Sequence, residues 1–232
     1  MKFSVIIPSW NEGFHIASSL KRLRQISTQG PLEIIVVDGA SEDDTAAQAR
    51  LHADVVLEHD ACNRGAQLHA GACRATGDLL LFLPGDAQLP GSWQQVLEHF
   101  WLAPALRGVS ATAFTVEFGA SRPLRLASAL WNASLRWRGR ARLEHGLCTT
   151  PEIYRQTDGF PPLCCLADIV FSRALRAVGR IEILPDRIWP SASRLHRYGV
   201  LGLAGRQAWL ELRWRLGASP EALWRRYSGW AS

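Results

Sequence analysis

Two stretches decide the fold: residues 3–12 read FSVIIPSWNE, and residues 33–45 read EIIVVDGASEDDT. Each begins with a short run of apolar residues and ends in polar ones, which is typical of a strand buried on both faces. Between them, residues 13–26 place apolar side chains at helical spacing. A strand, a helix and a second strand in this order predict two parallel strands joined by a crossover helix.

The same alternation continues along the first half of the chain. Ser41, with Asp44 three residues later, predicts a capping box that opens a helix reaching residue 51. Right-handed crossovers then build a doubly wound, mostly parallel α/β sheet. The remaining elements expected here are strands at 54–57 and 78–83 and a helix over 65–75.

The second half is less regular. Its apolar spacing divides the chain into a domain over residues 1–198 and a helical, Trp/Arg-rich extension over 199–232, which we expect to pack on that domain. Ser219 and Pro220 supply an N-cap and a first-turn proline for a last helix. Further helices are expected over 90–102, 124–137 and 167–178, and extended segments over 111–118 and 181–184.

Charge is distributed unevenly. Residues 1–121 hold 8 Lys and Arg against 13 Asp and Glu, a net charge of −5, whereas residues 122–232 hold 18 against 8, a net charge of +10. Seven of the ten tryptophans follow residue 130. A basic half beside an acidic half predicts an anionic partner, which can be a phosphate compound, a nucleic acid or a membrane surface.

Several protein classes are excluded by the composition. No apolar run approaches the roughly 18 residues of a membrane-spanning helix, and the N-terminus lacks the pattern of a signal peptide. The five cysteines show no zinc-ligand spacing, so free thiols in a reducing compartment are expected. We therefore expect a globular protein of the cytoplasm, with no transmembrane segment and no disulfide scaffold.

Polar side chains follow three of the predicted strands. Asn11 and Glu12 follow the first strand, Asp38 and Ser41 the second, and Asp86 the fourth. The carboxyl ends of parallel strands meet at one edge of the sheet, where ligands of open α/β folds bind. Glycine-rich phosphate loops are absent, so these groups point to a base, ribose hydroxyls and a divalent cation rather than to a backbone phosphate cradle.

These motifs resemble family 2 glycosyltransferases of the GT-A fold. The resemblance starts with VIIPSWNE (5–12) and IIVVDGASEDDT (34–45). It is continued by RGAQLHAGA (64–72), GDLLLFLPGDAQLP (77–90) and GFP (159–161). Within the family, the chain is similar to the small transferases associated with arsenosugar biosynthesis and with radical-SAM/selenodomain gene neighbourhoods. The motifs cover nearly the whole chain.

The resemblance implies a role for each matching position. Asp38 would bind the nucleotide base, Glu12 and Asp43 the base or ribose, and Pro8 would shape the floor of the pocket. Asp168 would be the catalytic base of an inverting single displacement, and Asp86 would hold Mg²⁺ or Mn²⁺. The other positions expected to bind a UDP- or GDP-type nucleotide sugar are Asn11, Ser41, Arg64, Gln67, Asp86, Arg194 and Arg197.

The chain also departs from this subgroup. Its metal element reads Pro84-Gly85-Asp86 in place of His-Ala-Asp, and Ala167 precedes Asp168 in place of Glu. A divalent cation tolerates a single protein carboxylate when phosphates and water complete its shell. The alternative is a weakened or inactive homologue that keeps nucleotide-sugar binding. A protein that binds nucleic acid is disfavoured, because three strand ends carry carboxylates.

The C-terminal extension leaves three readings open. Its apolar stripe consists of Leu201, Gly205, Ala208, Leu212 and Leu216. That stripe can pack on the catalytic domain, contact the inner face of the membrane together with tryptophans, or form an oligomer. The acceptor, either a small molecule or a lipid-linked one, and the oligomeric state do not follow from the sequence.

Overall fold

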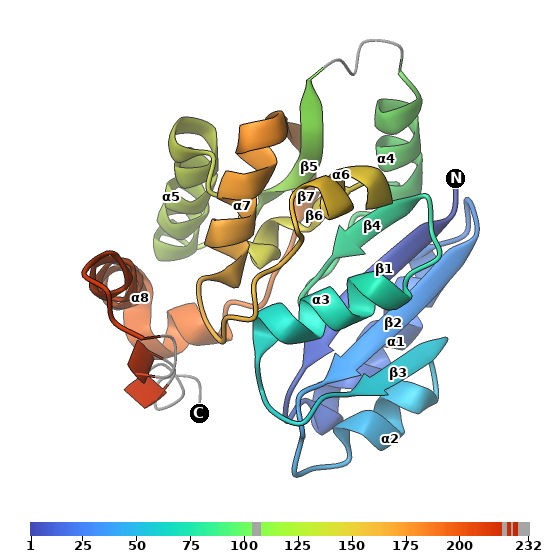
Figure 1. Cartoon of the computed structure of the whole chain (residues 1–232), viewed down its shortest axis with the longest axis horizontal. Helices are drawn as coiled ribbons and strands as arrows, with labels where there is room; N and C mark the ends of the chain where they lie inside the picture. The colour runs from blue at the N-terminus through green and yellow to red at the C-terminus, as the bar shows by residue number, and fades with distance from the viewer. Residues whose placement is uncertain (104–107, 220–221, 224, 227–232) are drawn as a thin grey trace.

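The computed structural model describes residues 1–103, 108–219, 222–223 and 225–226, with the side chain of Arg194 left aside. One seven-stranded sheet runs through the molecule in the order β3-β2-β1-β4-β6-β5-β7 (Figure 1). β1, β2, β3 and β4 are parallel, β5 and β7 are parallel, and β6 is antiparallel to both of its neighbours. The strands are β1 (Phe3–Ser9), β2 (Leu32–Asp38), β3 (Val55–Glu58), β4 (Leu79–Phe82), β5 (Val109–Val116), β6 (Leu147–Thr149) and β7 (Arg180–Ile188).

Helices cover both faces of this sheet, as expected for a doubly wound fold. One apolar cluster joins one face to α1, α2 and α4, and a second cluster joins the other face to α3, α6 and α7. The helices are α1 (Gly13–Ile26), α2 (Thr45–Arg50), α3 (Arg64–Arg74), α4 (Trp93–Leu102), α5 (Arg122–Arg138), α6 (Pro151–Gln156), α7 (Ala167–Val178) and α8 (Ser193–Arg215), with a 3-10 turn, η1, at Leu143–His145.

The apolar runs explain the parallel half of the sheet. All seven residues of β1 and all four of β4 are buried, because helices cover both sides of these strands. Strand β1 lies between β2 and β4, so the loops that follow these three strands leave the sheet at the same edge. This placement confirms the doubly wound, mostly parallel α/β fold.

One local prediction is wrong, and three short elements were not predicted. The capping box at Ser41 does not form, because the Ser41 hydroxyl donates to Asp38 Oδ1 (2.5 Å) and α2 begins only at Thr45. The short elements β6, η1 and α6 were not expected. Three to six residues give too few periods for an apolar pattern to stand out.

The C-terminal helix also differs from the expectation. Helix α8 continues across the predicted boundary between residues 198 and 199, with a break in helical geometry at Gly199 (φ 68°, ψ 165°). It packs against α5, and Leu210 on its inner face is buried. The stripe expected to make this packing faces solvent instead, since Leu201, Leu212 and Leu216 are 81%, 55% and 71% exposed.

In the part of the chain that the structure describes, no helix is both long enough and apolar enough to cross a bilayer.

Candidate functional site

The loops after β1 and β2 are joined into one polar rim. Asp38 ends β2, and its carboxylate accepts hydrogen bonds from the backbone N–H (2.9 Å) and the hydroxyl of Ser41. The Ser41 hydroxyl accepts the backbone N–H of Asn11 (2.9 Å), and the Asn11 side chain accepts that of Glu42 (2.9 Å). The structure thus brings together Asn11, Asp38 and Ser41, which the sequence had only placed at separate strand ends.

Asp43 extends the rim to the start of α1. Its carboxylate accepts hydrogen bonds from the backbone N–H groups of Gly13 and Thr45 (both 3.0 Å) and from the Thr45 hydroxyl. Burial acts to raise the pKa of Asp43, but the hydrogen bonds from Thr45 and Gly13 outweigh it and lower that pKa, so the side chain stays ionised. The backbone N–H of Glu12 donates to the same Thr45 hydroxyl (2.8 Å). Thr45 is therefore hydrogen-bonded both to the carboxylate of Asp43 and to the backbone N–H of Glu12.

Gln67 is buried beneath this rim. Its amide nitrogen donates both protons, one to the carbonyl of Ser9 (2.9 Å) and one to that of Val37 (2.8 Å). Pro8 is also buried and lies opposite Val37 in the sheet. Only the Gln67 amide oxygen is left for a ligand, and the side chain fixes the spacing of β1 and β2.

Cys62 lies within electrostatic range of Asp38 and Glu12 in the rim and of Cys164 in the second half of the chain. Burial raises the pKa of its thiol to about 11, and the charges acting on it include Arg64, Asp38 and Glu12. Arg64 is the first residue of α3, and its charge opposes the rise in the pKa of Cys62, whereas Asp38 and Glu12 add to it.

Asp86 lies on the exposed loop after β4. It lines a cavity of about 230 Å³ with Ser18 and Arg22 of α1. A Cβ on the preceding Gly85 would lie 2.5 Å from Glu12 Oε2, so a larger residue there would require the Glu12 side chain to shift. The Pro-Gly-Asp sequence thus allows the carboxylate of Glu12 to pack beside the Asp86 loop.

Metal binding by the predicted acidic side chains depends on how many of them lie close together. Among the described residues, no three His, Cys, Asp or Glu side chains form a cluster that could hold a metal alone. Asp86 makes no ion pair or hydrogen bond with described residues, so its carboxylate is available. Such a donor set fits a cation whose remaining ligands are phosphate oxygens and water.

Asp168 lies in a second, smaller cavity. This carboxylate, in the first turn of α7, lines a space of about 50 Å³ with Arg64, Arg142 and Glu144. The backbone N–H of Leu143 donates to its Oδ2 (3.3 Å). Burial raises the pKa of Asp168; Arg142 and Arg64 oppose the rise and Glu144 adds to it. A carboxylate with a raised pKa is a stronger base, which suits proton abstraction.

The backbone immediately before Asp168 adopts an unusual conformation. Leu166 has φ 64°, in the left-handed region, although it is not glycine. Ala40, in the rim after β2, does the same with φ 58°. Such residues cost free energy and persist where the surrounding structure holds them, often at functional sites.

Several residues of the Asp168 cavity were missed by the sequence analysis. Arg142 comes from the segment before η1, and Gln207 and Leu210 come from α8, so the C-terminal helix forms one wall. Arg142 precedes the segment LEHG (143–146), where the subgroup that the chain resembles has Gly-Asp-Gln-Gly, and this difference was the available signal. His145 in that segment is fully buried and its pKa falls to about 4 through burial, so the neutral imidazole contacts no ligand.

Arg197, one of the two arginines predicted on α8, lines neither the cavity of Asp86 nor that of Asp168. Arg197 is exposed and its guanidinium lies 5.4 Å from the ring centre of Tyr198. The side chain of Arg194 lies outside the described part of the structure, as do Pro220, Trp224 and Trp230.

A groove between α5 and α8 adjoins the Asp168 cavity. Its volume is about 190 Å³, and its lining includes Arg138, Arg140, Arg142, Gln207 and Glu211. Arg142 and Gln207 also line the cavity of Asp168, so the two spaces share a wall.

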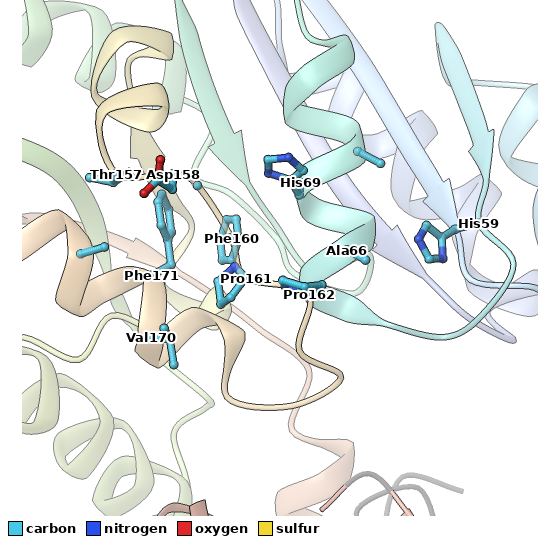
Figure 2. A pocket seen from close by; sticks show the side chains of 13 residues that line it. His59, Ala66, His69, Thr157, Asp158, Phe160, Pro161, Pro162, Val170 and Phe171 are labelled. Atoms are coloured by element: carbon cyan, nitrogen blue, oxygen red, sulfur yellow. The ribbon is translucent and has the colours of Figure 1, made fainter. Parts of the chain in front are cut away.

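The largest of these cavities lies on the other side of the loop before α7. It measures about 660 Å³ and is bordered by α3 and by the segment that carries Phe160 and Phe171 (Figure 2). Its His69 is hydrogen-bonded to the Tyr154 hydroxyl (3.2 Å). None of the residues predicted for the site lines this cavity.

Comparisons with solved structures support the fold. The chain is 20% identical to the TarS fragment 1–349 of S. aureus (TM-score 0.64), covering 87% of this chain and 63% of that one. It is 19% identical to glucosyl-3-phosphoglycerate synthase of Mycobacterium tuberculosis, solved with Mn²⁺, UDP and glucosyl-3-phosphoglycerate (TM-score 0.65), covering 94% and 81%. At these identities the similarity establishes the GT-A fold alone.

Sequence comparisons identify the family. An uncharacterized glycosyltransferase of Haemophilus influenzae is 31% identical over 98 residues, which are 41% of this chain and 33% of that protein. The chain thus spans a third of the length of that relative and less than two thirds of the TarS fragment. The family model described as "Glycosyl transferase family 2" matches residues 4–157, which include the whole polar rim. The chain belongs to glycosyl transferase family 2.

Proposed function

We propose that the chain transfers a sugar from a nucleoside-diphosphate sugar to an acceptor hydroxyl, with inversion at the anomeric carbon. The observation that carries this proposal is the position of Asp168, a half-buried carboxylate with a raised pKa that lines one cavity with Arg64 and Arg142. The charge of Arg64 also acts on Cys62, as do those of Asp38 and Glu12 in the polar rim.

In the proposed reaction, Asp168 takes the proton of the acceptor hydroxyl. The acceptor oxygen forms a bond to the anomeric carbon while the bond from that carbon to the β-phosphate oxygen breaks. Nucleoside diphosphate leaves with the bonding electrons and carries additional negative charge. Arg64 lies where it would stabilise that charge, and such electrostatic stabilisation is commonly the largest contribution to the rate.

The rim is proposed to hold the nucleotide. Asp38 and Ser41 would contact the base, Glu12 and Asp43 the ribose, and Asn11, Pro8 and Gln67 would keep the loops in place. The structurally similar proteins solved with UDP support a UDP-type nucleotide, and GDP is the alternative. Arg194 and Arg197 are proposed to meet the diphosphate only if α8 moves closer to the rim.

Asp86 is proposed to bind Mg²⁺ or Mn²⁺ together with the two phosphates. The synthase of M. tuberculosis was solved with Mn²⁺ and UDP, which supports a cation in this position. A divalent cation there would offset the charge of the leaving diphosphate. A lone exposed carboxylate beside Glu12 predicts modest affinity for the free ion and tighter binding once nucleotide is present.

The subgroup, the cellular location, the class of acceptor and the domain boundary are proposed as well. We assign the chain to the arsenosugar-associated subgroup on its motifs, with action in the cytoplasm on a small-molecule or lipid-linked acceptor. We also propose that the domain ends near residue 198, where Gly199 breaks the helix.

A thermal-shift experiment tests the proposal. The purified chain is heated with UDP, GDP or ADP, each with and without Mn²⁺. One nucleotide should raise the melting temperature in a manganese-dependent way, by the several degrees that about 2.7 kcal/mol of binding at a hundredfold excess over Kd implies. The Asp168→Asn variant should keep this shift and lose sugar transfer. A folded protein that no nucleotide stabilises would contradict the proposal, and nucleotide binding by a wild type without turnover would identify an inactive homologue.

A further inference from the structure

The outer faces of α5 and α8 combine exposed apolar side chains with positive charge only. On α8, Leu201, Leu212 and Leu216 point to solvent, and on α5 Trp137 is 85% exposed. Helix α5 contains four arginines and no acidic residue, and the single acid of α8 is Glu211. The two helices pack together at the edge of the molecule away from β3 (Figure 1).

Glu211 does not add negative charge to the outer surface of these helices. Its carboxylate points inward and pairs with Arg140 (2.5 Å) and Arg142 (3.8 Å), and all three side chains are largely buried. Burial lowers the pKa of Arg140; Glu211 opposes that effect, and Arg138, Arg215 and Arg173 reinforce it. Positive charge is therefore crowded around one buried carboxylate.

The groove between the helices has the matching composition. Its lining, around about 190 Å³, includes Arg138, Arg140 and Arg142 but only one carboxylate, that of Glu211, which pairs with Arg140 and Arg142. An excess of arginine in a small space selects an anion, and guanidinium groups bind phosphate with paired hydrogen bonds. The groove has room for a phosphate group but not for a whole nucleotide.

We infer that the outer faces of α5 and α8 form a docking surface for an anionic lipid bilayer, with a lipid phosphate in the arginine groove. Exposed leucines and tryptophan enter the interface, and the arginines meet anionic headgroups. A second copy of the chain is disfavoured, because it would bring two surfaces of the same sign together. Nucleic acid is disfavoured, because its phosphate backbone would leave the exposed leucines without an apolar partner.

Vesicle co-sedimentation of the full chain tests this inference without sugar donor or acceptor, so its failure is distinct from failure of the proposed function. One set of vesicles is phosphatidylcholine, and the other is an equal mixture of phosphatidylcholine and phosphatidylglycerol. The chain should partition at least about tenfold more strongly onto the anionic vesicles, and salt should weaken this binding.

Matched variants separate the apolar and cationic contributions. The double variant Leu201→Glu, Leu212→Glu should lose about tenfold or more of the binding. Leu51→Glu, made on a 66% exposed leucine at the end of α2, should leave it unchanged. Arg138→Gln should reduce the preference for anionic vesicles more than Arg155→Gln on α6 does. These sites are exposed, so folding is checked by an unchanged melting temperature.

Three outcomes would overturn the inference. The first is equal partitioning of the wild type onto neutral and anionic vesicles. The second is a loss of binding in Leu51→Glu as large as in the double variant. The third is a concentration-dependent dimer in analytical ultracentrifugation that the double variant abolishes, which would assign the surface to a second copy of the chain.

Discussion

The rim after β1 and β2 and the cavity of Asp168 are built in different ways. In the rim, the carboxylates of Asp38 and Asp43 accept hydrogen bonds from backbone groups of the neighbouring loops, as Asp38 does from Ser41. The cavity instead gathers Arg64, Arg142 and Asp168 from three distant segments and closes them with α8. The proposed binding surface is thus fixed by local hydrogen bonds, whereas the proposed base, Asp168, depends on tertiary packing for both its position and its pKa.

The largest effect is expected from the base itself. Asp168→Asn keeps the shape of the side chain but cannot accept the proton, so kcat should fall by about 10²–10⁴-fold while nucleotide binding persists. Steady-state kinetics beside nucleotide titration measures the two separately. Equal loss of nucleotide binding and turnover would instead indicate that Asp168 binds the nucleotide, as is proposed for the rim.

A smaller effect is expected at the rim. Asp38→Asn weakens the hydrogen bonds that Ser41 donates and removes a charge that would face the base, so nucleotide affinity should fall by about tenfold to a hundredfold. Isothermal titration calorimetry measures it, with Asp54→Asn on the loop before β3 as a control carboxylate. Unaltered affinity would mean that Asp38 only shapes its own loop.

Packing between the two regions is tested at Gly65. A Cβ there would lie 2.0 Å from the Pro161 carbonyl oxygen and 2.9 Å from the Leu163 nitrogen, both backbone atoms. Gly65→Ala should lower the free energy of unfolding by about 1–3 kcal/mol, measured in urea. Gly205→Ala, on an open helix face, should not destabilise. Full stability of Gly65→Ala would show that the loop before α7 moves freely.

The smallest expected effect concerns pH. Because the folded pKa of Asp168 lies above its ordinary value, the native state binds that proton more tightly than the unfolded state does. This contribution to stability is complete below the ordinary pKa of about 3.9 and is lost as pH rises through the raised value. At neutral pH, Asp168→Asn should therefore unfold at the same or a higher temperature than the wild type. A lower temperature would show that the ionised carboxylate is stabilised.

The sequence predicts the rim better than the cavity, for a physical reason. Asn11, Asp38 and Ser41 follow buried strands directly, so strand periodicity alone places them at one edge. Arg142, Gln207 and Leu210 meet Asp168 only through the packing of η1 and α8, which periodicity does not encode. The stripe from Leu201 to Leu216 shows the same limit: spacing reveals that one face is apolar, and says nothing of what covers it.

Gly199 interrupts the helical geometry of α8. Nothing lies within 4 Å of where its Cβ would be, and its left-handed φ comes one residue before the buried Val200. Beyond Gly199, Gln207 and Leu210 line the cavity of Asp168, while Leu201 and Leu212 face solvent on the same helix. The cavity of the proposed base and the proposed lipid-binding surface therefore share one helix, so a substitution that displaces α8 would affect both.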